Sequence, residues 1–222
     1  MRRAENAVSV APMSMSDVPR VNRGKSWGQD YEFSLMDRFG MWLSTRQIRR
    51  RLGGLTEKDV CDIGCGFNAV FIRSILDEVR SATVVDLSLA PDLKENPKVH
   101  AIEGILPDVL DRIAEHSLDI VICNNILEHL WDPKKALERV RRMLRHGGAC
   151  FLNVPSWRGK FVLETAAFRL GITSREEIND HKTYYAPREL WSLVVKSGFK
   201  PSEIICRTHK FGLNTYAVCT VD

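Results

Sequence analysis

The residues that could do chemistry concentrate around two glycines, Gly64 and Gly66. A short apolar run, residues 60–63, ends at the first glycine, and an apolar-periodic segment begins at Ala69. This order predicts a buried strand, a tight turn and the start of a helix. Because glycine has no Cβ, the backbone of such a turn can approach a ligand closely, and the first amides of a helix offer hydrogen-bond donors. The turn therefore predicts a binding site for a nucleotide-type ligand.

Two carboxylates narrow the choice of ligand. Asp62 lies in the predicted strand two residues before Gly64, and Asp86 ends the next apolar run. The pattern Gly64-x-Gly66-x-x-Ala69, with an acid about twenty residues further on, satisfies the dinucleotide fingerprint, in which the acid binds ribose hydroxyls. Asp62, however, would repel a pyrophosphate and would suit a ligand that carries an ammonium group. An adenosine-bearing ligand with a cationic tail is therefore favoured over a dinucleotide.

The elements that must position these residues alternate between strand and helix from residue 59 onward, which is typical of a parallel sheet with helices on both faces. The expected fold is α/β, with a doubly wound, mostly parallel sheet. A link of only three residues, 210–212, joins the last two runs and suits a hairpin, so the sheet is expected to end in an antiparallel pair. The strands are predicted at about 59–63, 82–86, 99–102, 118–123, 149–155, 201–209 and 213–221.

The chain divides into three regions. Residues 1–20 are aperiodic and predict a flexible tail, and residues 21–58 predict one or two helices lying across an edge of the sheet. Residues 59–222 form the α/β domain, in which residues 156–182 break the strand–helix rhythm and predict an insertion. Such an insertion would stand over the carboxyl ends of the strands, where open α/β sheets bind ligands.

Composition and charge disfavour several classes of protein. A hydrophobic content of 44% and a charged content of 27% are ordinary for a globular chain, and no apolar run approaches the ~18 residues that a membrane span needs. An interrupted apolar patch after Met1 does not fit a secretory signal, and six cysteines without a CxxC pair indicate a reducing compartment. We therefore expect a cytoplasmic protein without a metal site. The net charge of +4 is concentrated in residues 1–58, but its Arg49-Arg50-Arg51 run suits a solvated helix end, and no nucleic-acid partner is expected.

Several motifs together resemble those of the class I S-adenosylmethionine-dependent methyltransferases, of the small-molecule, type 11/12-like branch. The stretch Val60-Cys61-Asp62-Ile63-Gly64-Cys65-Gly66 is similar to the family's first motif, an acid followed by x-Gly-x-Gly. The resemblance extends over residues 59–221 through Asp86, through Leu118 to Leu130 with its Glu-His element, through Leu144-Arg145-His146-Gly147-Gly148, and through Tyr185 to Leu190 with Ser197-Gly198-Phe199. Two stretches depart from the family pattern. Phe67-Asn68 stand near its frequent third glycine, and Glu103 to Pro107 lack its common Asp-Ala pair.

The resemblance implies a Rossmann-like sheet of seven strands and S-adenosyl-L-methionine as cofactor. It places Asp62 against the ammonium of the methionine moiety and Asp86 against both ribose hydroxyls. Leu87 would pack on adenine, whose other edge would meet the segment after the third strand. The remaining cofactor contacts would come from Gly64, Cys65, Gly66, Gly104, Ile105, Asn124 and Asn125.

Two histidines could act as a base if the acceptor is a hydroxyl, because imidazole exchanges protons near neutral pH. His129 belongs to the Glu-His element, and His181 lies in a polar-aromatic cluster ahead of the last major helix. Structural hydrogen bonding and loop packing are the alternatives for these two positions. Candidate substrate contacts are Tyr31, Tyr184 and Tyr185, and a lid formed by Trp27, Gln29 and Tyr31 is an alternative to their packing on the sheet edge.

The sequence thus predicts a methyltransferase that moves a methyl group to a small-molecule, glycan-linked or lipid-linked acceptor, at oxygen. An NAD(P)-dependent oxidoreductase of Rossmann type is the alternative that the fingerprint leaves open, and a catalytically silent methyltransferase-like binding module is another. The pattern points to the cofactor and leaves the acceptor and the oligomeric state open.

Overall fold

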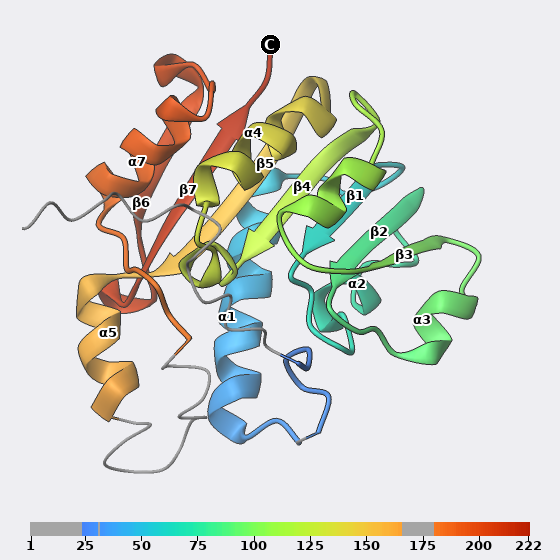
Figure 1. The fold of residues 1–222 in the computed structure, drawn as a ribbon, viewed down its shortest axis with the longest axis horizontal. Coiled ribbons are helices and arrows are strands. Elements are labelled where there is room, and N and C mark those ends of the chain that lie inside the picture. Colours follow the sequence, from blue (N-terminus) through green and yellow to red (C-terminus); the bar gives the residue numbers. More distant parts are fainter. Residues whose placement is uncertain (1–23, 31, 166–179) are drawn as a thin grey trace, which may run out of the picture.

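A seven-stranded mixed sheet forms the centre of the chain in the computed structural model, which describes residues 24–30, 32–165 and 180–222 (Figure 1). The strand order is β3-β2-β1-β4-β5-β7-β6, and every neighbouring pair is parallel except those that involve β7. The predicted antiparallel end of the sheet is therefore confirmed. The strands are β1 Asp59–Ile63, β2 Ser81–Asp86, β3 Val99–Glu103, β4 Leu118–Asn124, β5 Leu144–Pro155, β6 Ile204–His209 and β7 Asn214–Thr220.

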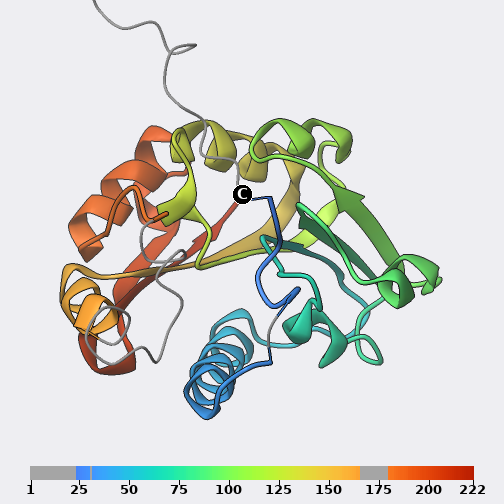
Figure 2. The same ribbon diagram turned by 60° about the horizontal axis from the view of Figure 1, so that its bottom comes forward.

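Helices cover both faces of this sheet, as Figure 2 shows. On one face, apolar residues of η1, α4 and α7 pack on the central strands, and on the other, residues of α1, α2 and α3 do so. The interior strands are mostly apolar because both of their faces are covered. β1 is buried at every position, its two aspartates included. The helical segments are α1 Leu35–Leu52, α2 Val70–Arg73, α3 Pro91–Glu95, η1 Asp108–Arg112, η2 Leu127–His129, α4 Pro133–Met143, α5 Trp157–Glu164, α7 Pro187–Lys196, η4 Pro201–Glu203 and η5 Lys210–Gly212.

The order of the strands creates a crevice beside β1. The chain runs outward from β1 to β2 and β3 and then returns to form β4 on the other side of β1. Connections on either side of such a switch point leave in opposite directions, which opens a space at the carboxyl ends of the strands. The register pairs Ile63 with Val85 on one side and with Cys123 on the other. The residues that follow these three positions therefore meet at one edge of the sheet.

The N-terminal region differs from its prediction. Residues 35–52 form one continuous helix, α1, whose Ile48 is buried in the core on one face of the sheet, together with Phe151 of β5 and Tyr216 of β7. The helix does not lie across an edge. Its start is fixed by a capping box, in which the Ser34 hydroxyl accepts from the Asp37 amide while the Asp37 carboxylate accepts from the Ser34 amide.

The helix expected after the glycine turn is much shorter than its apolar spacing predicts. α2 contains only residues 70–73, and Ala69 before it adopts a left-handed conformation with φ of 41°. The left-handed residue is therefore Ala69 and not Asn68, whose side chain donates to the Gly28 carbonyl (3.3 Å). The apolar residues of this stretch, such as Ile72 and Ile75, still reach the core, but they do so from successive turns.

Two of the predicted regions fall mostly outside the described residues. The tail at 1–20 lies outside them, as does the stretch 166–179 of the predicted insertion, whose first part forms α5. The division into three regions stays a prediction. Among the described residues, no helix combines the length and apolarity that crossing a membrane requires.

The start of α5 is packed directly against the turn before β7. Ser156 caps the helix by accepting from the Gly159 amide (3.0 Å), and the Ser156 hydroxyl donates to the Gly212 carbonyl (2.6 Å). A Cβ at Gly159 would lie only 2.1 Å from the carbonyl oxygen of Leu213. In contrast, Gly40 in α1 has nothing within 4 Å of the same position. The two glycines therefore differ in whether a methyl group fits.

We expect Gly159→Ala to lower the free energy of unfolding by about 1–3 kcal/mol, since the backbone must shift to admit the methyl group. The matched control, Gly40→Ala, should raise it by about 0.5–1 kcal/mol because alanine loses less conformational freedom in a helix. Urea unfolding followed by circular dichroism measures both. Equal effects of the two substitutions would contradict this packing of α5.

Candidate active site

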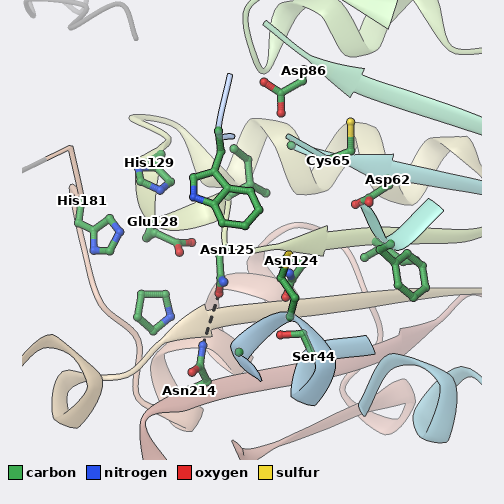
Figure 3. A pocket seen from close by; sticks show the side chains of 18 of the residues that line it. Ser44, Asp62, Cys65, Asp86, Asn124, Asn125, Glu128, His129, His181 and Asn214 are labelled. Carbon is green, nitrogen blue, oxygen red and sulfur yellow. Dashed lines mark hydrogen bonds between the residues drawn. The ribbon is translucent and has the colours of Figure 1, made fainter. Parts of the chain in front are cut away.

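A cavity of about 1140 Å³ opens at the carboxyl ends of β1, β2 and β4 (Figure 3). It contains the two predicted carboxylates, the predicted histidines and most of the other predicted contacts. Its wall is completed by α1, by α5 and by the turn between β6 and β7. The predicted site residues that line it are Asp62, Gly64, Cys65, Asp86, Leu87, Gly104, Ile105, Asn124, Asn125, His129 and His181.

Asp62 is a buried carboxylate at the floor of this cavity. The residue is only 4% exposed, and no described residue donates a hydrogen bond of its own to the Asp62 carboxylate. Burial, and then the charge of Asp86, raise the pKa of Asp62 to about 7. A carboxylate in this condition gains most from a cationic partner, because ionisation is what the surroundings oppose. The floor of the cavity is therefore suited to an ammonium group.

The glycine turn leaves room for a ligand, but its amides donate hydrogen bonds to other residues of the protein. The Gly64 amide donates to the Val85 carbonyl (2.8 Å), and the Cys65 amide donates to the same oxygen (3.3 Å). The Gly66 amide donates to Asp86 (2.8 Å). These three amides are therefore used by the fold, whereas the predicted donors were the first amides of the helix that follows. A pyrophosphate would need free donors, and Gly64, Cys65 and Gly66 do not supply them.

Glycine is required at Gly64 for two reasons. Its φ is +73°, and a Cβ there would lie within 3 Å of the Ile126 side chain. The neighbouring Cys65 lines the cavity, and burial raises the pKa of its thiol well above the usual range. Cys65 is therefore a neutral, small wall residue and not a nucleophile.

Asp86 is held at the end of β2 by hydrogen bonds to both of its oxygens. One oxygen accepts from the Gly66 amide (2.8 Å), and the other accepts from the Leu87 amide (2.8 Å) and from the Ser26 hydroxyl. The oxygen that accepts from the Gly66 amide has a further lone-pair direction, so this fixed group can still accept from a neighbouring hydroxyl. The arrangement suits a ribose.

The segment before α1 lies against the glycine turn. The Trp27 carbonyl accepts from the Phe67 amide (2.9 Å), and the Trp27 ring stacks on Phe33 with centroids 4.5 Å apart. A Cβ at Gly66 would come within 3.2 Å of Trp27. Trp27 also lines the cavity, as the lid interpretation expects, whereas Tyr31 lies outside the described residues.

The side of the cavity where adenine is predicted to lie is formed by residues that follow β2 and β3. Leu87, Gly104 and Ile105 border the cavity there. The Glu103 carboxylate is engaged elsewhere, because it accepts from the Leu89 amide (2.7 Å) and pairs with Lys94 (2.7 Å). This wall is therefore apolar side chain and backbone, which suits a flat base.

Two asparagines stand at the end of β4. The Asn153 side chain donates to the amide oxygens of Asn124 (2.9 Å) and Asn125 (3.0 Å), and Asn214 donates to Asn125 (3.4 Å; Figure 3). Asn125 has a left-handed φ of 57°. Both amide oxygens are thus directed at β5 and β7, so contact of Asn124 or Asn125 with a ligand would use their other groups.

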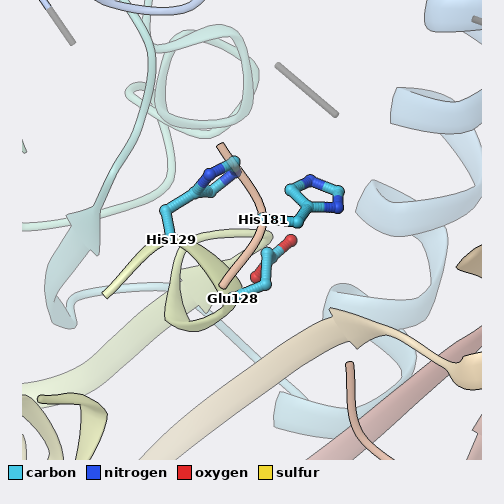
Figure 4. Close-up of side chains that lie close together, drawn as sticks. All are labelled: Glu128, His129 and His181. Atoms are coloured by element: carbon cyan, nitrogen blue, oxygen red, sulfur yellow. The ribbon is translucent and has the colours of Figure 1, made fainter. Parts of the chain in front are cut away.

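The imidazole rings of His129 and His181 lie next to each other in the cavity wall (Figure 4), with their centroids 4.7 Å apart. His129 Nδ1 lies 2.9 Å from a carboxylate oxygen of Asp180, and the other oxygen of Asp180 accepts from Lys182 (2.6 Å). Burial opposes ionisation of Asp180, but the hydrogen bonds from His129 and Lys182 outweigh it and lower its pKa to about 2. Asp180 is therefore an acceptor, and the proton of a neutral His129 is on Nδ1. This leaves Nε2 as the basic atom.

Glu128 adds a third possible metal ligand to this group. One ligand atom from each of Glu128, His129 and His181 lies within 4.8 Å of the other two. The set could hold a divalent cation, with Asp180 orienting His129 from behind. The spacing of acids and cysteines in the sequence did not indicate this cluster, because its members come from segments about fifty residues apart.

The two predicted tyrosines do not line the cavity. Tyr185 packs in the core on the α4 and α7 face, and burial raises the pKa of its phenol above the usual range. The hydroxyl of the buried Tyr184 lies 3.0 Å from His181 Nδ1. Tyr185 is therefore a core residue and Tyr184 supports His181, and a substrate contact by these rings stays a prediction.

Sequence reasoning missed Ser26 and Asp180 as functional candidates. Ser26 lies sixty residues before the carboxylate it contacts, and Asp180 lies fifty-one residues after His129. No local sequence pattern predicts either contact. The only available signal was the acid next to a candidate catalytic histidine, in Asp180-His181, whereas Asp180 contacts His129 in the structure.

The geometry agrees with the comparisons to known proteins. Residues 37–204 match the family described as "Methyltransferase domain". The chain is 30% identical over 195 residues to a "Ubiquinone biosynthesis O-methyltransferase" of Klebsiella pneumoniae, covering 81% of this chain and 76% of that protein. A protein of the same name from Escherichia coli is 30% identical over 185 residues, covering 78% and 75%. The family match begins in α1, earlier than the motifs indicated.

Solved structures share the fold. A "SAM dependent methyltransferase" from Archaeoglobus fulgidus superposes with a TM-score of 0.58 at 14% identity, covering 84% of this chain and 99% of that one. The Haloferax volcanii "putative methyltransferase" in complex with its Trm112 activator gives 0.63 at 15% identity, covering 83% and 91%. The chain belongs to the class I S-adenosylmethionine-dependent methyltransferases and is an enzyme of that type.

The raised pKa of Asp62 predicts that ligand affinity depends on pH. Only the ionised carboxylate attracts an ammonium, so affinity for S-adenosylhomocysteine should fall as the pH drops below about 7, by up to about tenfold per unit. Calorimetry between pH 5.5 and 8 measures this. Asp62→Asn should weaken binding and flatten the profile, whereas Glu115→Gln, an exposed carboxyl on another part of the surface, should leave it unchanged. A wild-type affinity that does not change with pH would contradict the role of Asp62.

Proposed function

We propose that this methyltransferase transfers the methyl group of S-adenosylmethionine to a hydroxyl oxygen of a small or lipid-linked acceptor, with His129 as the base. The cofactor, when bound, supplies a methyl group activated on a sulfonium. Asp62 would hold its ammonium and Asp86 its ribose. The observation that carries the proposal is the His129–Asp180 pair, whose 2.9 Å contact leaves Nε2 as a proton acceptor in the cavity.

The residues around the acceptor have a limited task. The sulfonium is already a good leaving group, so the chain must chiefly place the acceptor and exclude water. Leu130 and Trp131, which follow His129 in the chain, and Leu106 also line the cavity, so part of its wall is apolar and favours an apolar acceptor. Withdrawal of the hydroxyl proton by His129 Nε2 would make the oxygen a better nucleophile, and the resulting imidazolium would be stabilised by ionised Asp180.

The relatives add support for oxygen as the accepting atom. The curated proteins at 30% identity carry the name "Ubiquinone biosynthesis O-methyltransferase". An acceptor with a hydroxylated ring and an apolar extension would suit the cavity beside His129. A glycan-linked acceptor is less well matched by that apolar wall. A cytoplasmic location, the absence of a nucleic-acid partner and a substrate of this class stay predictions.

The roles of His129 and Asp180 can be tested by methyl transfer from labelled S-adenosylmethionine to a panel of phenols, catechols, aliphatic alcohols, amines and thiols. We expect His129→Asn to lower kcat by about 10²–10⁴-fold. Asp180→Asn should also lower kcat, since it removes the partner that sets the imidazole tautomer. Both variants should bind S-adenosylhomocysteine normally, and His100→Asn, an exposed histidine of β3, serves as the control.

The panel also separates the alternatives. Preferred transfer to amines or thiols would contradict an oxygen acceptor. Loss of wild-type activity on chelation with EDTA, restored by a divalent cation, would replace the histidine base by a metal held at the Glu128–His129–His181 cluster. Tight NAD(H) binding without a response to S-adenosylhomocysteine would contradict the cofactor assignment.

A further inference from the structure

Large apolar side chains are exposed on the elements that surround the cavity opening. Leu35 is 85% exposed, Phe161 is 75% exposed and Phe211 is 92% exposed. We call these residues and their exposed apolar neighbours the mouth patch. It consists of Leu35, Met36, Phe39 and Trp42 of α1, Phe161 and Val162 of α5, and Phe211 of η5.

The outward side of α1 explains why this patch is unusual. A helix that packs on a sheet normally presents a polar face to water. α1 buries Ile48 and Ser44 against the sheet, yet Leu35, Phe39 and Trp42 follow one another at helical spacing on the exposed side. The rings of Phe39 and Trp42 are stacked, with centroids 5.9 Å apart. The exposed side of α1 is therefore an organised apolar stripe, of the kind that marks an interaction surface.

The mouth patch is continuous with the cavity. Met36, Phe39, Val162 and Phe211 contribute to the cavity wall as well as to the surface. Figures 1 and 2 both place α5 and the turn before β7 on the same end of the molecule as the start of α1. A partner that covers this patch would therefore meet the opening through which the acceptor must pass.

Basic side chains border the apolar stripe. Arg38 and Arg46 are exposed and stand one helical turn to either side of Trp42, and the Arg46 guanidinium lies 5.7 Å from the Trp42 ring centre. Residues 35–52 contain five arginines and one aspartate. Arg49 is paired with Glu78 (2.7 Å), so Arg38 and Arg46 are the arginines that border the stripe. The single aspartate is occupied in the cap of the helix. The surface is therefore apolar at its centre and cationic at its border.

We propose that the mouth patch docks on an anionic phospholipid surface, so that the enzyme takes its acceptor from the bilayer. Apolar side chains would enter the interface while arginines contact phosphate groups, the two contributions that peripheral membrane binding combines. The inference rests on the proposed function for its acceptor, which it narrows to a membrane-dissolved, hydroxyl-bearing lipid. A second copy of the chain is a poorer occupant, because a two-fold contact would place the arginines of α1 against each other and close the opening.

Vesicle flotation of the full chain tests this without cofactor. We expect binding to vesicles of phosphatidylcholine with one third phosphatidylglycerol, little binding to phosphatidylcholine alone, and release by salt. Arg38→Glu with Arg46→Glu should lower the partition coefficient by at least about tenfold. Leu35→Ser with Phe161→Ser, two patch residues that do not line the cavity, should do the same. The matched controls are Arg207→Glu and Ile205→Ser, both exposed on β6, and these should bind as wild type does.

Further measurements keep the result unambiguous. Urea unfolding shows that each variant is folded, and S-adenosylhomocysteine binding should be unchanged in all of them. Vesicle binding without cofactor binding would leave the docking surface standing and remove the proposed function, whereas cofactor binding without vesicle binding would do the reverse. Equal binding by the patch variants and wild type, or a concentration-dependent dimer that Leu35→Ser with Phe161→Ser abolishes, would overturn the proposal.

Discussion

The carboxylate of Asp62, buried in the central strand beside a glycine turn, is the constraint on which the rest of the site depends. Its pKa of about 7 shows that the surroundings oppose its charge. Because this pKa lies above the value of about 4 expected in the unfolded chain, the group's contribution to stability is greatest below that value and is lost as the pH rises toward 7. The sheet tolerates this cost because β1 is paired along its length on both sides. A bound ammonium would offset this cost, because it favours the ionised form of Asp62.

The same edge of the sheet decides which adenosine ligand fits. The sequence fingerprint is shared by dinucleotide and sulfonium enzymes, and in this chain the turn amides add to Asp62 in distinguishing the two. The amides of Gly64 and Cys65 extend the ladder to Val85, and that of Gly66 fixes Asp86. The turn thus lets a ligand approach the backbone closely, but the amides of Gly64, Cys65 and Gly66 are not available as donors to a phosphate. Fixing Asp86 in this way would suit it to the ribose that we propose it binds, so that one turn would serve both ends of the cofactor.

Sequence reasoning predicted the sheet well because its strands are short apolar runs buried on both faces, and because the turn residues mark where they end. It failed where tertiary contacts decide. Residues 70–79 have helical apolar spacing, yet the left-handed Ala69 and a single turn of helix are what the packing allows. The sequence did not indicate that α1 packs on a face of the sheet, because apolar residues lie on both sides of the helix. Likewise, no pattern distinguishes a tyrosine that faces a ligand from Tyr185, which faces the core.

The residues of the candidate site that lie near the ends of strands could be predicted from the sequence. Asp62, Asp86 and His129 each follow or end a recognisable run, and the register of neighbouring strands brings them to one edge. Their partners come from distant segments. Ser26 precedes α1, and Asp180 follows the stretch outside the described residues. Contacts of this kind depend on the whole fold, so they cannot be derived from spacing.

The most direct measurement compares two ligands that differ only in the amino-acid tail. S-adenosylhomocysteine carries the ammonium, and 5′-methylthioadenosine lacks it. We expect the wild type to prefer the former by roughly tenfold to a hundredfold, as hydrogen bonds to charged groups contribute, and Asp62→Asn to lose most of this preference. Asp86→Asn should weaken both ligands alike. A preference that survives unchanged in Asp62→Asn would contradict the role given to this buried carboxylate.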